Sequence, residues 1–465
     1  MDLTRLFYPR SIAVVGASPH MGDGKIPWYQ ILRGVGYQGE LYPVNPAHRE
    51  IHGVPVLPSL EAVPDGVDLA IVSVPARHAL STLQAAVKKR IGFVHFFTSG
   101  FSEAGNRGAE EELVRAARQG GTRILGPNCI GAHCTESRLT FDPSVRPRPP
   151  GNVAFLGQSG GVTNNFARAA QARKVDLNKA VSYGNQIDLR VEDFLEYFAD
   201  DAAIKVVAAY IEDVKDGPAF IKALKKATAK KPVVVLKGGS TEAGARAAMS
   251  HTGALSGRRE VFAAVMRQTG CIEVSTPEEM LDVVMLATAE RPARGPRVAF
   301  LGAGGGTSVL FTDLAVAAGL TLPPLAEKSQ ALIAAKIPNV NTSTLNPVDL
   351  GAFGVDFRIM ELAARAISHD ENIDVIVPYF SLDFASMFKD ETIEQGLAGI
   401  VAAARDTEKL VVPIISRSAE DVPRLEHLRL MAFKAFRAAG LPVFNTTQDA
   451  VSAIFKISAR RASQG

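Results

Sequence analysis

Short runs of aliphatic and β-branched residues alternate along the chain with longer, Ala-rich amphipathic segments. A short continuous apolar run is typical of a strand that is buried on both faces, and alternation of such runs with helical segments is typical of βαβ units around a parallel sheet. The pattern therefore predicts an α/β protein, with strands at residues 11–15, 67–73, 91–97, 153–157, 206–211, 232–236 and 298–302.

Proline-rich breaks at 138–151 and 291–296 divide the chain. We place domain boundaries at these breaks because prolines interrupt both helices and sheets. The expected domains cover residues 1–145, 150–290 and 296–465.

An internal repeat relates the second and third of these sections. The run Val-Ala-Phe-Leu-Gly occurs at 153–157 and again at 298–302, and each copy is followed by a glycine-rich turn and a helix, at about 162–174 and 308–318. Both sections are therefore expected to have related flavodoxin-like folds. The rest of the third section is expected to contain strands near 375–377 and 410–415, the run Pro442–Phe444 and a helix at 449–457.

Composition narrows the class of protein. The chain has 465 residues, 47% of them hydrophobic and 21% charged, which is typical of a globular protein and excludes disordered and collagen-like classes. A formal net charge of +3 disfavours a nucleic-acid binder. The cysteines, Cys129, Cys134 and Cys271, form neither a disulfide framework nor a metal motif, so we expect a cytoplasmic setting. We find no signal segment and no apolar run of the ~18 residues that a membrane helix needs.

The first strand leads into a glycine-containing turn, Gly16-Ala17-Ser18, that resembles a dinucleotide fingerprint without its full spacing. A nicotinamide site also needs an acid at the end of the second strand, to bind the ribose hydroxyls. The second strand ends instead in Asn45-Pro46. This disfavours a dehydrogenase, and leaves open either a phosphate-bearing ligand at the helix N-terminus or a tight turn without a ligand.

The glycine-rich turn of the second section, Gly157-Gln158-Ser159-Gly160-Gly161, suits an anion. Glycines let backbone amides converge at the start of a helix, where the helix dipole favours negative charge, and Ser159 adds a hydroxyl. A bare turn is one alternative. A nucleophilic serine is another, although the nucleophile elbow reads Gly-X-Ser-X-Gly.

His251 lies in a polar segment of small residues, Ser250-His-Thr-Gly253. It is either catalytic or simply solvated. Glu212 follows the strand at 206–211 and so projects at the carboxyl edge of the sheet, where a carboxylate could orient an imidazole. Asp188 could have a similar role at the carboxyl edge of a sheet, or could be a turn residue or a helix N-cap. The other histidines show no metal-ligand spacing, so no metal site is expected.

Taken together, these motifs resemble the NDP-forming acyl-CoA synthetases, the family of the succinyl-CoA synthetase α subunit, and especially the α subunits of ADP-forming acetate–CoA ligases. The resemblance covers essentially the whole chain and depends on the order of its landmarks, which are 9–18, 42–46, 74–75, 126–129, 157–161, 182–185 with Asp188, 250–253 and 346–349. It implies an α/β fold with an N-terminal Rossmann-like CoA-binding domain followed by two flavodoxin-like domains.

In this family, an acyl-CoA thioester is linked to nucleotide phosphorylation through an acyl phosphate and a phosphohistidine. The resemblance makes His251 the phosphorylated residue, Glu212 the carboxylate that orients it, and Ser159, Gly160 and Gly161 the phosphate-binding residues. It places coenzyme A on the first domain, against Gly16, Ser18, Lys25, Asn45, Pro46, Val74, Pro75, Ser99, Gly100 and Asn128.

The family's nucleotide site belongs to an ATP-grasp module, for which we find no segment here. We therefore expect an ATP-grasp β subunit that holds ADP or ATP with Mg²⁺, in an α2β2 assembly. The substrate would be a small carboxylic acid, with acetate as the default. The glycine-rich loop 302–307 departs from the family pattern and is given no catalytic role. A catalytically inactive, CoA-sensing protein on the same scaffold is the rival hypothesis.

Overall fold

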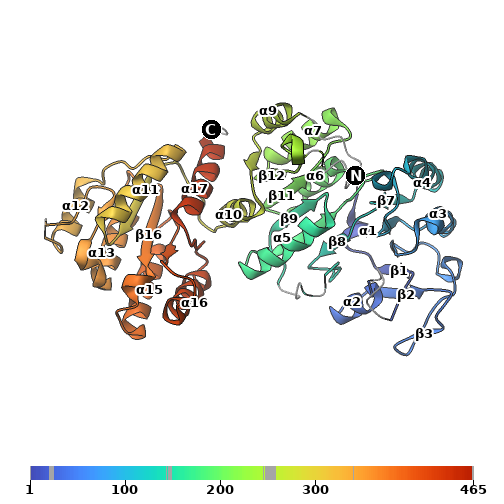
Figure 1. The fold of residues 1–465 in the computed structure, drawn as a ribbon, viewed down its shortest axis with the longest axis horizontal. Coiled ribbons are helices and arrows are strands. Elements are labelled where there is room, and N and C mark those ends of the chain that lie inside the picture. The colour runs from blue at the N-terminus through green and yellow to red at the C-terminus, as the bar shows by residue number, and fades with distance from the viewer. Residues whose placement is uncertain are drawn as a thin grey trace. The chain divides into compact units, whose positions relative to one another are not determined.

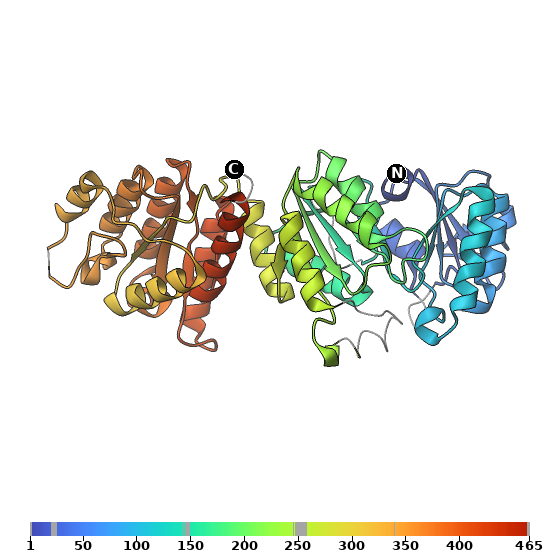
Figure 2. The same cartoon turned by 90° about the horizontal axis from the view of Figure 1, so that it is seen from above.

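The computed structural model describes residues 2–19, 26–142, 144, 149–244, 246, 258–338 and 340–462. The chain divides into compact units at Met1–Leu281 and Asp282–Gly465. The boundary falls within helix α10, Pro277–Ala287. Within each unit, the strands of each sheet run between helices (Figures 1 and 2).

The first unit begins with a five-stranded parallel sheet in the order β2-β1-β5-β6-β7. Its central strands are almost wholly buried, as expected for continuous apolar runs covered by helices on both faces. The strands are β1 (Ser11–Val15), β2 (Glu40–Val44), β5 (Leu69–Val72), β6 (Phe93–Phe96) and β7 (Arg123–Leu125), and the hairpin β3 (Glu50–Ile51) with β4 (Val54–Pro55) lies apart; the helices are α1 (Thr4–Phe7), α2 (Trp28–Gly34), α3 (Ala79–Lys88) and α4 (Arg107–Gly120).

The same unit contains a six-stranded sheet in the order β13-β12-β11-β9-β10-β8. All neighbouring strands are parallel except β8, which pairs antiparallel with β10 and belongs to this sheet although it lies within the first section of the sequence. The elements are β8 (Gly131–Cys134), β9 (Val153–Gly157), α5 (Gly160–Ala172), β10 (Leu177–Ser182), α6 (Val191–Asp200), β11 (Val206–Ile211), α7 (Gly217–Thr228), β12 (Val233–Lys237), α9 (Arg259–Thr269) and β13 (Ile272–Val274).

The second unit contains a third parallel sheet, in which β15, β14, β16 and β17 follow one another and β18 also pairs with β16. Its glycine-rich turn is fixed by Asp349, whose Oδ1 atom accepts the backbone N–H of Gly304 at 2.8 Å. The elements are β14 (Val298–Gly302), α11 (Gly305–Ala318), α12 (Glu327–Ala334), β15 (Val348–Asp349), α13 (Phe357–Ser368), β16 (Val375–Ser381), α14 (Leu382–Ala385), α15 (Asp390–Arg405), β17 (Leu410–Val411), β18 (Ile414–Ser416), α16 (Pro423–Ala438) and α17 (Thr447–Ala462).

Most strands predicted from apolar runs are present. The run at 410–415 is divided into β17 and β18, because Pro413 has no N–H to donate to a continuous ladder. The run Pro442–Phe444 contributes only an isolated bridge, between Phe444 and Ile414. Among the described residues, no helix is both long enough and apolar enough to cross a membrane.

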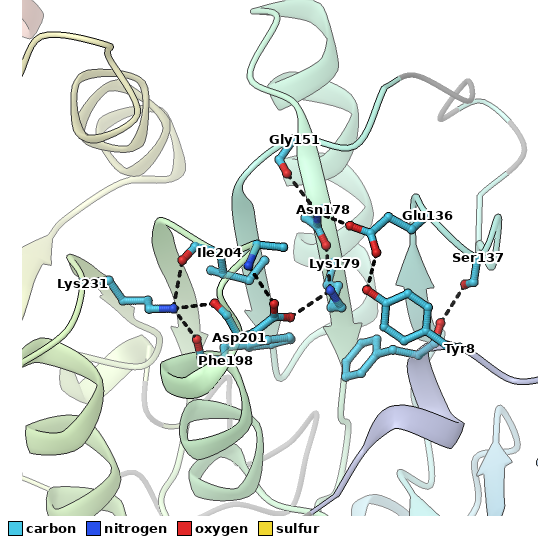
Figure 3. A network of polar contacts seen from close by, with 12 residues as sticks. Tyr8, Glu136, Ser137, Gly151, Asn178, Lys179, Phe198, Asp201, Ile204 and Lys231 are labelled. Carbon is cyan, nitrogen blue, oxygen red and sulfur yellow. Dashed lines mark hydrogen bonds and ion pairs between the residues drawn. The ribbon is translucent and has the colours of Figure 1, made fainter.

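A buried polar network joins the chain's N-terminal segment to the second sheet (Figure 3). Lys179 of β10 is 0% exposed, and its Nζ atom lies 2.8 Å from Asp201 Oδ2 and 2.7 Å from Asn178 Oδ1. The ring of Tyr8 covers this ammonium at 5.0 Å, and the Tyr8 hydroxyl donates to Glu136. The segment that precedes the first sheet is thereby fixed to the second sheet, at the end opposite the candidate site.

Candidate active site

The candidate catalytic residues follow neighbouring strands at the carboxyl edge of the six-stranded sheet. Gly157 ends β9, Ile211 ends β11 and Lys237 ends β12, and the register pairs Tyr210 with Gly157 and Ile211 with Lys237. The residues after each strand therefore meet at one edge. In parallel α/β sheets this edge is where ligands bind.

Helix α5 begins at this edge, at Gly160 within the predicted anion-binding turn. Ser159 is the N-cap, and its Oγ atom accepts the Val162 N–H at 3.4 Å. A Cβ on Gly160 would lie 2.9 Å from Ile130 Cγ2, so a side chain there requires Ile130 to move, whereas Gly161 is exposed and has room for one. The first-turn N–H groups of a helix lack intrahelical acceptors, and the helix dipole makes this end attractive to an anion.

Glu212, the first residue after β11, is 6% exposed and is held through its backbone. Its N–H donates to Gln158 Oε1 at 2.8 Å, and its carbonyl oxygen accepts from Lys237 Nζ at 2.7 Å. Gln158 lies between the candidate phosphate-binding glycines and the strand. Gln158, after β9, and Lys237, at the end of β12, therefore both fix the backbone of Glu212, the candidate orienting residue.

Asp213 extends the same network away from the helix terminus. Its Oδ1 atom accepts from the side chains of Gln158 and, at 2.8 Å, Gln186, and its Oδ2 atom lies 2.7 Å from Lys215 Nζ. Asp213 is 5% exposed, so these partners offset the cost of burying its charge.

Lys237 contributes a buried cation beneath Glu212. Its Nζ atom also donates to the Gly238 carbonyl and lies 5.7 Å from the centre of the Phe262 ring. Burial lowers the pKa of Lys237, while the nearby Asp213 and Glu212 carboxylates act in the opposite direction. The Lys237 amine therefore links the backbone that follows β11 to the backbone that follows β12.

The predicted CoA residues lie at the carboxyl edge of the first sheet. Gly16 follows β1 with φ +84°, and a Cβ there would lie 2.3 Å from the Ser73 carbonyl oxygen, so the close approach requires glycine. Asn45 follows β2, and its Nδ2 atom donates to the Ala17 carbonyl at 2.8 Å. The structure thus brings Gly16, Ser18 and Asn45-Pro46 together on neighbouring strand ends.

The other described residues of the predicted CoA site follow the next strands of that sheet. Val74-Pro75 follow β5, and the Val74 carbonyl accepts from Thr98 Oγ1 at 2.7 Å. Ser99 and Gly100 follow β6, and the Asn128 N–H donates to the Thr98 carbonyl at 2.9 Å. Thr98 therefore fixes both the β5 turn and the Gly126–Asn128 loop.

The region next to these edges contains a groove of about 1020 Å³. It is lined by α4, by the 185–190 loop and by residues 213–215, and Asn185, Gln186 and Asp213 are its most buried members. Arg107, Arg115 and Arg118 are exposed along α4 on the other side. The network around Asp213 therefore borders a groove that α4 of the first domain also lines.

Other sequence predictions have different outcomes. Lys25 and His251 lie within 20–25 and 247–257, outside the described residues. Asp188 forms an ion pair with Arg123 at 2.8 Å and accepts the Ile124 N–H at 2.8 Å, so it fixes the start of β7. Among the described residues there is no group of acids, histidines or cysteines that could hold a metal ion.

Sequence reasoning did not single out Gln158, Asp213, Lys237 or Asn185 as parts of the site. Gln158 lies inside the Gly157–Gly161 motif and Asn185 inside the Ser182–Asn185 landmark, so their positions gave a signal. Their partners are distant in sequence, as for Gln158 and Glu212, which are separated by 54 positions.

Comparison with known proteins gives the class of this chain. Residues 10–135 match the family model described as a CoA binding domain, and residues 150–287 match the model of a succinyl-CoA ligase-like flavodoxin domain. A CoA-binding domain followed by such a ligase domain defines the acyl-CoA synthetase class.

Relatives narrow the class further. The chain is 34% identical to the acetate–CoA ligase [ADP-forming] II subunit alpha of Pyrococcus furiosus over 98% of this chain and 97% of that subunit. It is 36% identical to acetate–CoA ligase [ADP-forming] I of Archaeoglobus fulgidus over 82% of this chain and 56% of that ligase. The solved structure of acetyl-coenzyme A synthetase 1 of Ca. Korarchaeum cryptofilum, in complex with phosphate and ADP, superposes with a TM-score of 0.87 at 29% identity, covering 100% of this chain and 98% of that chain.

The chain therefore belongs to the NDP-forming acyl-CoA synthetase family of acid–thiol ligases, as a member of the ADP-forming acetate–CoA ligase α-subunit group.

Proposed function

We propose that this chain is the α subunit of an ADP-forming acyl-CoA synthetase. It interconverts an acyl-CoA, ADP and phosphate with a carboxylic acid, CoA and ATP, through an acyl phosphate and a phosphohistidine at His251. The observation that carries the proposal is the position of Glu212, which is buried and held by Gln158 directly beside the glycine-rich start of α5.

Each group has a chemical role in this scheme. Phosphate attacks the thioester, so that CoA leaves and an acyl phosphate forms; the His251 imidazole then takes the phosphoryl group and releases the carboxylate. Glu212 fixes the tautomer of the imidazole and raises its basicity. The N–H groups at Gly160 and Gly161 stabilise the negative charge that the transferring phosphoryl group carries.

Coenzyme A is assigned to the first domain. The turn at Gly16–Ser18 would hold its phosphates, with Lys25 adding charge. Asn45-Pro46, Val74-Pro75 and Ser99-Gly100 would line the nucleotide and pantetheine path, and Asn128 would lie near the thiol end. The match to a CoA binding domain at 10–135 supports this assignment.

The final phosphoryl transfer, from His251 to ADP, is assigned to an ATP-grasp β subunit that holds the nucleotide with Mg²⁺, in an α2β2 complex in the cytoplasm. The lengths of the relatives support this division: the chain spans 97% of a relative named as a subunit alpha but 56% of a ligase whose name gives no subunit. The acyl group stays open, because relatives are named for acetate, 4-hydroxybutyrate and ferulate.

The test is to incubate the chain with a candidate ATP-grasp subunit, labelled ATP and Mg²⁺, and to look for an acid-labile, base-stable phosphate on this chain. We expect label on the wild type and none on His251→Ala. Absence of label with a subunit shown to bind would contradict the proposal and favour the CoA-sensing protein.

A further inference from the structure

Asn185, which follows β10 in the ligase domain, has its side chain among groups of the first domain. It is 7% exposed. Its Nδ2 atom lies 2.6 Å from Glu103 Oε2 and 2.8 Å from Glu110 Oε1. The uncharged amide of Asn185 therefore donates to two carboxylates of the first domain, Glu103 and Glu110.

These carboxylates in turn shape the loop that follows β6. The Glu103 Oε1 atom accepts the backbone N–H of Gly100 at 2.6 Å and that of Phe101 at 3.2 Å. The Glu110 Oε1 atom accepts the Ser102 N–H at 3.2 Å. Gly100 has a φ of +106°, so the loop adopts a conformation that needs such support. Asn185 thus holds the acceptors around which this loop is built.

Asn185 is also joined to the Gly126–Asn128 loop. Its N–H donates to the Pro127 carbonyl at 3.0 Å, and its Oδ1 atom accepts from Asn128 Nδ2 at 3.4 Å. The preceding Gly184 has φ +54°, and a Cβ there would lie 2.2 Å from the Pro127 carbonyl oxygen. The backbones are therefore in close contact, and one residue connects both loops.

An amide is the side chain that this position requires. Burial by itself raises the pKa of Glu103, but hydrogen bonds from Asn185 and from the backbone N–H groups of Gly100 and Phe101 outweigh it, and the pKa is lowered. Glu103 therefore accepts as a carboxylate. An aspartate at 185 would have the same shape but only acceptor atoms, and would repel both glutamates.

We propose that Asn185 is a positioning residue for the thioester half-reaction. It holds the Gly100–Ser102 loop, which begins in the segment assigned to the pantetheine path, and Asn128, which is assigned to the thiol end of coenzyme A, in register with the ligase domain that carries the phosphohistidine. The inference rests on the proposed function. The inference makes different predictions for the two half-reactions. Loss of Asn185 slows the step that uses CoA and leaves phosphorylation by ATP intact.

The experiment measures the half-reactions separately on the complex with the ATP-grasp subunit. Labelled ATP and Mg²⁺ charge the chain, and discharge is then timed with CoA plus the acid, among acetate, ferulate and 4-hydroxybutyrate, that is fastest for the wild type. For Asn185→Asp and Asn185→Ala we expect charging within about twofold of wild type, and discharge at least about tenfold slower, since misplacement by about 1 Å can cost about a hundredfold. The KM for CoA should rise while the KM for the nucleotide stays unchanged.

Matched variants separate positioning from general damage. Asn106→Asp makes the same chemical change at an exposed position just before α4 and should leave both half-reactions unchanged. Glu103→Gln combined with Asn185→Asp exchanges donor and acceptor between the partners, and should recover discharge relative to Asn185→Asp alone.

The outcomes are distinct. Wild-type discharge by Asn185→Asp, or an equal loss of both half-reactions in a variant that melts at the wild-type temperature, overturns the inference. If Asn185→Asp does not fold, Asn185→Ser, which keeps one donor, replaces it with the same expectations. Absence of label on the wild type contradicts the proposed function instead, before Asn185 is tested.

Discussion

Gln158, which follows β9, holds the backbone of Glu212, which follows the neighbouring strand β11. The Gln158 Oε1 atom accepts the backbone N–H of Glu212 at 2.8 Å and that of Asp213 at 3.0 Å. Gln158 is 3% exposed, so water does not compete strongly for these donors. Gln158, inside the glycine-rich turn, therefore fixes the backbone of the two acidic residues that follow the neighbouring strand.

Replacement of Gln158 should accordingly slow phosphoryl transfer without unfolding the chain. In Gln158→Ala the N–H groups of Glu212 and Asp213 lose their acceptor, and the carboxylate is displaced from the helix terminus. We expect charging from labelled ATP to fall by about ten- to a hundredfold, the range that follows small displacements of catalytic groups. Gln268→Ala, at an exposed position on α9, is the control; charging of Gln158→Ala at the wild-type rate would contradict this role.

The start of α5 offers a steric comparison between adjacent glycines. A Cβ at Gly160 would lie 2.9 Å from Ile130 Cγ2, whereas one at Gly161 meets nothing closer than Ser159 Oγ at 3.9 Å. Gly160→Ala should therefore lower stability by about 1 kcal/mol or more, as overpacking does. Gly161→Ala should be neutral or slightly stabilising, because alanine favours a helix.

Thermal melting of the two variants checks this difference. Ile130→Val keeps the Cγ2 methyl group and should not rescue Gly160→Ala, whereas Ile130→Ala removes it and should recover part of the loss. Equal melting temperatures for Gly160→Ala and Gly161→Ala would show that the contact with Ile130 is unimportant.

The Lys179–Asp201 ion pair should be important for stability rather than for catalysis. Lys179 is completely buried, and its ammonium is held by Asp201 and Asn178 beneath the Tyr8 ring (Figure 3). Lys179→Met leaves the Asp201 carboxylate without its ionic partner. Breaking a buried ion pair is strongly destabilising, and because Asp201 is partly exposed we expect a loss of unfolding free energy of only about 3 kcal/mol. The melting temperature of the first unit, measured by calorimetry, should fall by about 6 °C.

A second substitution tests the cause of that loss. Asp201→Asn in the Lys179→Met background removes the uncompensated charge and should recover part of the melting temperature. If the melting temperature does not recover, the stabilisation comes from packing of the Lys179 alkyl chain rather than from its charge.

Buried His95 should make stability depend on pH. Burial lowers the pKa of His95 to about 4, although its contact with the Cys129 carbonyl, at 2.9 Å from Nε2, acts in the opposite direction. The folded state therefore keeps His95 neutral where the unfolded chain, with a pKa near 6.5, binds a proton. This contribution is complete above about pH 6.5 and is lost as the pH falls toward 4, by about 3 kcal/mol.

His95→Gln tests the assignment, because glutamine does not titrate and has an amide that can donate to the Cys129 carbonyl. The melting temperature of this variant should fall less between pH 7 and pH 4.5 than that of the wild type. Part of the dependence should remain, because burial also lowers the pKa of His133 to about 4. Identical slopes for both proteins would exclude His95 as a source.

The amino-acid sequence by itself determined the strands, the repeated glycine-rich turns and the family. Continuous apolar runs and glycine spacing are local properties, so they are readable wherever a strand is buried on both faces. The positions of Glu212 directly after a strand and of Gly160 at the start of a helix could be predicted for the same reason. His251 and Lys25 remain predictions, because they lie outside the described residues.

Only the tertiary structure decided which groups share a hydrogen bond. Asn185 and Glu103 lie 82 positions apart, and Lys179 is buried because its strand is internal to a six-stranded sheet. The physical reason is that a polar side chain in a buried strand end must find a partner, and the order of strands in the sheet determines which distant residue is near enough to be one.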